Sequence, residues 1–159
     1  MKNHKNNSLI STGIIAENKQ ARFNYTISET FESGIVLLGS EVKSLRLKRC
    51  NITGGFIAPS NKGELFIHNL IIPEYIKTNQ IMGHIENRIR KLLLNKREIN
   101  KISGIFRAGN VTIVPLKIYF NQKGFVKILI GIGKGKKQYD KREIIKKRDW
   151  DRHKARLVK

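Results

Sequence analysis

The sequence predicts a mainly β protein, a small antiparallel β-barrel with two or three accessory helices and a basic C-terminal tail. Segments of alternating apolar and polar residues indicate strands, and glycine-containing turns separate them. The last quarter of the chain combines glycine with lysine and arginine, which cannot form a core. In this 159-residue chain we expect a disordered N-terminus at 1–13, one domain at 14–133 and the tail at 134–159.

The first strand is predicted at residues 25–38, where Gly34 interrupts the alternation. A glycine inside a long strand suggests a bulge or a bend of the kind that small barrels need. Residues 39–49 favour a short helix with Ser40 as its N-cap. Its outward face would carry Lys43, Arg46, Lys48 and Arg49.

The middle of the chain is expected to contain a hairpin and two helices. Strands at 51–58 and 64–72 are separated by the turn-forming residues 59–63. After a loop at 76–85, apolar residues at helical spacing predict two consecutive helices with a kink at Asn95. Asn95 and Glu98 form a capping-box pattern, and Gly104 is expected to end the second helix, although Ile105 and Phe106 could extend it.

The clearest strands are 111–120 and 125–132, joined by the short loop 121–124. Pro115 cannot donate a hydrogen bond to a neighbouring strand, so it marks an edge or a bulge. Five or six antiparallel strands with inserted helices fit a barrel of the oligonucleotide-binding (OB) kind. An open antiparallel sheet flanked by helices is the alternative.

The charge points to a polyanionic partner, because the formal net charge is +20 and the isoelectric point is near 10.4. Nucleic acid is the first candidate. No apolar run is long enough to span a bilayer, and the apolar residues of the tail are too scattered for a membrane-surface helix, so we expect no membrane association. The single cysteine fits a reducing, cytoplasmic compartment. Such a charge also disfavours self-association, which predicts a monomer.

An enzyme is poorly supported, and we expect no catalytic residues, metal or cofactor. The four histidines are scattered, and no phosphate-binding loop motif occurs. Glu29 and Glu32 are expected to be solvated surface acids rather than a catalytic pair. Phe31 and Phe56 are predicted core residues, whereas Tyr139 lacks apolar neighbours and could stack on an unpaired base.

From Gly133 to Lys159 the tail contains 12 Lys and Arg against 4 Asp and Glu. Asp140 and Glu143 suit a helix start, but the apolar residues do not form one stripe. We therefore expect a segment that is loose alone and ordered by a polyanion. A solvated tail that only aids solubility is the alternative.

Several long segments resemble the SsrA-binding protein family, the small protein B of bacteria. They follow one order from about Asn18 to the C-terminus, at 18–22, 29–38, 39–46, 90–94, 114–116, 119–120 and 134–142. One departure is Asn51-Ile-Thr-Gly-Gly-Phe56, where the family usually has Asn-x-x-Asp-Ser-Tyr.

The resemblance implies an OB-like barrel that binds the tRNA-like domain of transfer-messenger RNA. The complex, with elongation factor Tu and GTP, would enter stalled ribosomes for trans-translation. The tail would become helical in the vacant mRNA channel near the decoding centre. A ribosomal or general structural RNA-binding protein is the alternative, and an RNA-modifying enzyme is the least supported class.

The resemblance also implies site residues. RNA-binding positions are Asn18, Glu32, Leu93 and Lys127, with Leu93 rather than Leu94 exposed. We add the basic candidates Arg22, Lys43, Arg46, Lys134, Lys136 and Lys137. The tail positions for the ribosome are Tyr139, Asp140, Lys141 and Arg142, followed by Lys146, Lys147, Arg148 and Trp150.

Overall fold

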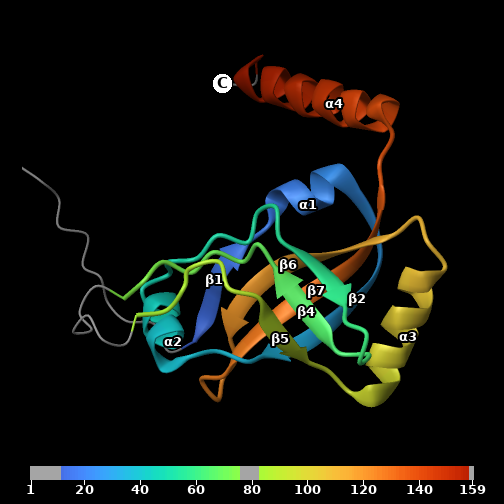
Figure 1. The fold of residues 1–159 in the computed structure, drawn as a ribbon. Helices are drawn as coiled ribbons and strands as arrows, with labels where there is room; N and C mark the ends of the chain where they lie inside the picture. Colours follow the sequence, from blue (N-terminus) through green and yellow to red (C-terminus); the bar gives the residue numbers. More distant parts are fainter. Residues whose placement is uncertain (1–11, 76–82, 158–159) are drawn as a thin grey trace, which may run out of the picture.

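A computed structural model describes residues 12–75 and 83–157, which form one antiparallel sheet and four helices (Figure 1). The strands are β1 (Gly13–Glu17), β2 (Tyr25–Ile35), β3 (Phe56–Pro59), β4 (Leu65–His68), β5 (Arg90–Leu93), β6 (Thr112–Phe120) and β7 (Val126–Gly135). The helices are α1 (Lys19–Asn24), α2 (Gly39–Arg46), α3 (Lys96–Arg107) and α4 (Gln138–Leu157). The mainly β prediction is therefore confirmed. The predicted disordered segment 1–13 lies almost entirely outside the described residues.

The sheet closes on itself as a ring, which we call the barrel. The strand order is β1-β6-β3-β4-β5-β2-β7, and the additional pairing of β6 with β7 closes the ring. β6 continues past β3 and also pairs with β1, which lies outside the ring. The long strands β2, β6 and β7 thus form one wall on which the outer face can carry a site.

The barrel is filled mainly by isoleucine and leucine side chains. Residues such as Ile57, Ile67, Ile118 and Ile130 are fully or almost fully buried, and Leu45 of α2 and Ile102 of α3 join them. Burial raises the pKa of the nearby Cys50 thiol to about 12 against the charge of Arg90, so the thiol stays protonated at neutral pH.

A second, smaller cluster lies under α1 on the outer face of the sheet. Ala21 of α1 packs there with Val114 and Leu116 of β6. Gly131 of β7 makes room for it, because a Cβ at this position would lie 2.9 Å from Leu116 Cδ1. The cluster fixes α1 against the wall formed by β2, β6 and β7.

The predicted helix before Asn95 is wrong, because Arg90–Leu93 forms strand β5. Arg90 and Leu92 point inward and Leu93 points outward, so the burial alternates as in a strand. β5 pairs with β4 on one side and with β2 on the other. Long-range pairing thus overrides a helical spacing that is fortuitous in this segment.

The prediction for α3 is confirmed at its start and corrected at its end. Asn95 is the N-cap, and its backbone N–H donates to Glu98 Oε2 over 3.0 Å. The helix passes through Gly104 and ends at Arg107, as Ile105 and Phe106 allowed. The predicted loop at 76–85 lies mostly outside the described residues.

Two local predictions differ in detail from the structure, one agrees with it, and two short elements were not predicted. The N-cap of α2 is Leu38, whose N–H donates to Glu41 Oε2, and Ser40 lies inside the helix. β2 is shifted in register between Ile27 and Glu29 rather than at Gly34. Of the edge or bulge expected at Pro115, the structure has a register shift between Pro115 and Lys117. β1 and the six-residue helix α1 carry too little periodicity to have been predicted from sequence.

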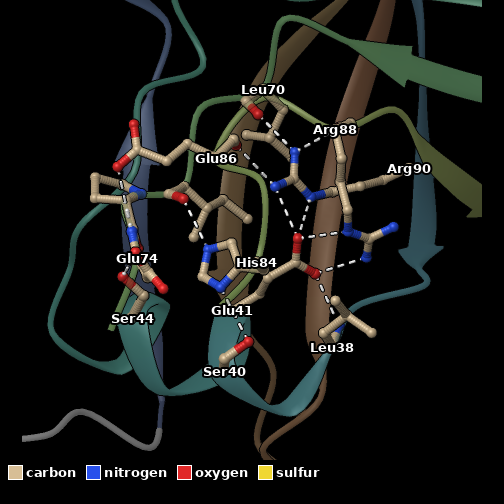
Figure 2. A network of polar contacts seen from close by, with 12 residues as sticks. Leu38, Ser40, Glu41, Ser44, Leu70, Glu74, His84, Glu86, Arg88 and Arg90 are labelled. Carbon is tan, nitrogen blue, oxygen red and sulfur yellow. Dashed lines mark hydrogen bonds and ion pairs between the residues drawn. The ribbon is translucent and has the colours of Figure 1, made fainter. Parts of the chain in front are cut away.

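A buried ion network ties α2 to β5 and to the segment that leads into it (Figure 2). The Glu41 carboxylate accepts from Arg88 Nη2 over 2.7 Å and from Arg90 Nε over 2.9 Å, and the Glu41 and Arg90 side chains are completely buried. Burial alone would raise the pKa of Glu41. The hydrogen bonds from Arg88 and the Leu38 N–H and the charge of Arg90 reverse this and lower it.

The same network organises the chain that leads into β5. Arg90 also donates to the backbone carbonyls of Leu70, Glu86 and Arg88, so its guanidinium is saturated. His84 bridges the Ser40 hydroxyl and the Ile72 carbonyl, each over 2.9 Å. These contacts support the backbone on which Leu93 is presented, and they have no signature in the sequence.

Candidate nucleic-acid interface

Three residues that the resemblance singles out come together on the outer face of the barrel. Glu32 of β2, Leu93 of β5 and Lys127 of β7 line one hollow of about 470 Å³. The strand register explains this, because Gly34 lies opposite both Leu93 and Lys127, two residues along from Glu32. Leu93 is 52% exposed, whereas Leu94 packs against the core, as expected.

Glu32 is held in place by a side chain from another strand of the same wall. The hydroxyl of Tyr119 on β6 donates to Glu32 Oε2, and the Lys117 ammonium lies 5.5 Å from the centroid of the Tyr119 ring. Burial, together with the Glu32 carboxylate, raises the pKa of Tyr119 to about 12. The hydroxyl therefore remains a donor at neutral pH, which fixes the orientation of the carboxylate.

Glu29 is not part of this arrangement. Its carboxylate forms an ion pair with Lys101 of α3 over 2.7 Å. Among residues 12–75 and 83–157 there is no group of three or more His, Cys, Asp or Glu side chains that could hold a metal ion. In the same part of the chain no helix is long and apolar enough to cross a membrane.

A second group of the predicted residues lies where β7 leaves the barrel beside α1. Lys134 pairs in register with Thr26 of β2. Lys136 Nζ donates to the Arg22 carbonyl over 2.9 Å, and the Lys136 N–H donates to the Asn24 carbonyl over the same distance. Lys137 is next in the chain. These contacts therefore place four basic residues between α1 and the start of α4, namely Arg22, Lys134, Lys136 and Lys137.

Asn18 has a structural role in this region. The residue is only 4% exposed. As the N-cap of α1, its side-chain oxygen accepts from the Ala21 N–H, and its side-chain amide donates to the Pro115 carbonyl over 3.1 Å. It also borders a hollow of about 370 Å³ with Gly54 and Gly55. Contact between Asn18 and RNA stays a prediction, and its demonstrated partners hold α1 in place.

Lys43 and Arg46 are not brought to either group. They lie on α2, on a different side of the barrel from α1 and α3 (Figure 1). The Lys43 ammonium lies 5.8 Å from the centroid of the Tyr75 ring, and the Arg46 guanidinium lies 5.9 Å from that of Phe120. They form a separate basic face.

The tail residues form α4, which stands beyond the end of the barrel (Figure 1). The helix begins earlier than expected, because Asp140 lies in its first turn and Asp140 Oδ2 accepts from the Lys137 N–H. No residue of α4 is buried, and Tyr139 and Trp150 are 68% and 63% exposed. The other predicted tail positions lie on the same exposed helix, namely Lys141, Arg142, Lys146, Lys147 and Arg148. The order of α4 in the free protein stays a prediction.

Two exposed aromatic residues were missed by sequence reasoning. Phe56 was expected in the core, but it is 39% exposed and stacks on His68 of β4 with ring centroids 4.9 Å apart. Its outward position follows from the pairing of the two residues across β3 and β4. Phe125 directly precedes β7 and is 64% exposed. Its place in the alternation, on the same side as Lys127, could have revealed it.

The closed sheet, the hollow with Glu32, Leu93 and Lys127, and the projecting basic helix define an OB-like barrel of the nucleic-acid-binding class. Comparison with known proteins gives the family. The model of the SmpB protein family matches residues 15–159. The chain therefore belongs to the SmpB family.

Relatives and solved structures agree with this assignment. The SsrA-binding protein of Wolbachia pipientis wMel is 53% identical over 146 residues, which cover 92% of this chain and 97% of that protein. The SsrA-binding protein of Rhodospirillum rubrum is 44% identical over 153 residues, 96% of this chain and 95% of that protein. A chain from a solved tmRNA–SmpB structure concerned with the bacterial ribosome is 40% identical, with a TM-score of 0.66, and the match covers 86% of this chain and 95% of that one.

Proposed function

We propose that this protein binds the tRNA-like domain of transfer-messenger RNA and delivers it to stalled ribosomes for trans-translation. Membership of the SmpB family and the names of the relatives support this function. The observation that carries it is the meeting of Glu32, Leu93 and Lys127 in one hollow on the outer face of the barrel. The protein acts in this account by binding rather than by catalysis.

Two parts of the molecule divide the work. The barrel and the basic group at Arg22, Lys134, Lys136 and Lys137 hold the RNA, and α4 enters the mRNA channel near the decoding centre. α4 suits a polyanionic channel because its many basic side chains are exposed and none of its residues is committed to the core. Elongation factor Tu with GTP joins through the RNA, and the protein acts as a cytoplasmic monomer.

The alternative is a general or ribosomal RNA-binding protein, which the net charge of +20 also favours. Charge alone gives every RNA some affinity, and that part of the affinity falls steeply as salt rises. A contact set that includes a carboxylate and an exposed leucine is not explained by charge. Selectivity at physiological salt therefore separates the two functions.

The test is binding of the full chain to the tRNA-like domain of its own transfer-messenger RNA and to an ordinary tRNA of similar length, across a salt series. We expect tighter binding of the tRNA-like domain, with a preference that persists at physiological salt. Equal binding of both RNAs that vanishes in parallel as salt rises would exclude the adaptor function and favour the general RNA-binding protein.

A further inference from the structure

An apolar groove adjoins the hollow that contains Glu32. The groove has a volume of about 590 Å³ and lies between the start of α2, the end of β5 and the hairpin between β6 and β7. Leu37, Val42 and Leu93 form its apolar side, and Phe125, Lys123 and Lys127 come from the hairpin. Leu93 and Lys127 border both hollows, so the two surfaces are continuous.

The hairpin holds Phe125 in an exposed position. Asn121 Oδ1 accepts from the N–H groups of Lys123 and Phe125 over 3.0 and 2.8 Å, and the Asn121 N–H donates to the Phe125 carbonyl over 2.9 Å. Gly124 has a φ of 78°, which permits the tight turn. Phe125 is 64% exposed although its backbone is fixed, so an aromatic side chain is presented to a ligand at little entropic cost.

We propose that this groove accepts an unpaired base of the tRNA-like domain, with the base against Phe125 and the adjoining phosphates on Lys123 and Lys127. The inference rests on the proposed function and adds Phe125 and Lys123 to its contact surface. An aromatic ring can stack on any base, because every base has a π-face. The two ammonium groups can neutralise the phosphates that flank such a base.

The charge of the groove favours a nucleotide over an apolar peptide. Among the described residues that line the groove, two are lysines and none is acidic. An apolar partner would leave these ammonium groups without counter-charges, whereas a nucleotide supplies an apolar face and an anion together. The continuity with the Glu32 hollow places this nucleotide within the same bound RNA.

The experiment measures the affinity of full-length variants for the isolated tRNA-like domain across a salt series. Phe125→Ala should weaken binding by roughly 5- to 150-fold, the range found for the loss of one stacked base. The slope of log affinity against log salt should remain that of the wild type, because no charge is removed. Lys123→Ala should instead make this slope shallower by about 1.

Three further variants make the result specific. Phe125→Tyr should bind like the wild type, because it keeps the aromatic face. Phe125→Leu should bind weakly although it keeps the apolar bulk, which separates stacking from packing and covers the case in which the alanine variant fails to fold. Phe106→Ala is the matched control, because Phe106 is a 36% exposed phenylalanine at the end of α3, outside the groove, and should leave the affinity unchanged.

Wild-type affinity in both Phe125→Ala and Phe125→Leu would overturn the proposal, whatever their activity on ribosomes. Binding of an acidic apolar peptide in the groove with RNA affinity unaffected would also overturn it, in favour of a protein partner. A different result would contradict the proposed function itself, namely a wild-type protein that does not distinguish the tRNA-like domain from an ordinary tRNA.

Discussion

At the scale of single residues, Glu32 is the most informative side chain of the proposed interface. It is an exposed carboxylate on a chain with a net charge of +20, and the Tyr119 hydroxyl fixes its orientation. Such a group weakens a purely electrostatic attraction to RNA. It is therefore useful for RNA binding only if it makes a specific hydrogen bond, for example to a base edge that donates.

Glu32→Lys provides the corresponding prediction. The substitution adds two units of positive charge, yet we expect weaker binding of the tRNA-like domain, by roughly 10-fold or more for the loss of one charge-assisted hydrogen bond. Tyr119→Phe removes the hydroxyl that orients Glu32, so it should also lower the affinity, by less than Glu32→Lys does. Titration of labelled RNA measures both.

Glu64→Lys is the matched control, because Glu64 is a half-buried acid that pairs with Lys91 and lines neither the Glu32 hollow nor the apolar groove. It should leave RNA affinity unchanged or slightly raise it. If Glu32→Lys tightened binding as well, the carboxylate would have no specific partner and only total charge would matter.

Glu41 is the residue on which the fold depends most directly. Glu41→Gln leaves Arg88 and Arg90 without their buried counter-charge, and loss of one partner of a buried pair costs about 3–5 kcal/mol. Urea unfolding should show this loss in the free energy of unfolding. Glu64→Gln, which breaks an exposed pair, should cost no more than about 1 kcal/mol.

The stability difference between wild type and Glu41→Gln should also depend on pH in a defined direction. The pKa of Glu41 in the folded protein lies below its ordinary value of 4.5, so its stabilisation is complete above pH 4.5 and is lost as the pH falls through the folded pKa. The difference in stability between wild type and Glu41→Gln should be constant from neutral pH down to about 4.5 and shrink below it. A constant difference down to pH 2 would mean that this carboxylate is not the group responsible.

At the scale of elements, the sequence was reliable where local and long-range preferences agree. β6 and β7 alternate clearly and pair with each other in the wall, and α3 has both an apolar stripe and the Asn95–Glu98 cap. β5 was mistaken for a helix because its four residues are too few to show a period, and only pairing with β2 and β4 defines them. Glu32 and Lys127 could be identified as site residues only through the resemblance to a known family, because no local sequence pattern shows that two strands so far apart in sequence are neighbours.

Gly104 gives a prediction for α3. The helix continues through Gly104, which is exposed, does not have a positive φ, and has no atom within 4 Å of an added Cβ. Gly104→Ala should therefore raise the free energy of unfolding by about 0.5–1 kcal/mol. Urea unfolding measures the gain.

Gly131→Ala is the contrasting change in β7. Its Cβ would lie 2.9 Å from Leu116 Cδ1 and 3.0 Å from Ile27 Cγ2, so it should destabilise the protein by about 1–3 kcal/mol. A destabilising Gly104→Ala would mean that α3 ends where the sequence first suggested.

At the scale of the whole molecule, a closed barrel is followed by an exposed helix, and the end of β7 leads from one into the other. The core is complete without α4, because no residue of that helix is buried. The basic group beside α1 also precedes α4 in the chain, with Arg22, Lys134 and Lys136 joined by contacts to α1 and β2. RNA binding and ribosome function should therefore be separable.

Truncation after Lys137 is the most direct measurement of this claim. We expect the truncated protein to keep its thermal stability and to bind the tRNA-like domain with largely intact affinity, but to support no tagging of incomplete proteins in a reconstituted reaction with stalled ribosomes. A truncated protein that cannot bind the RNA, or one that still supports tagging, would contradict the division between an RNA-binding barrel and a ribosome-binding tail.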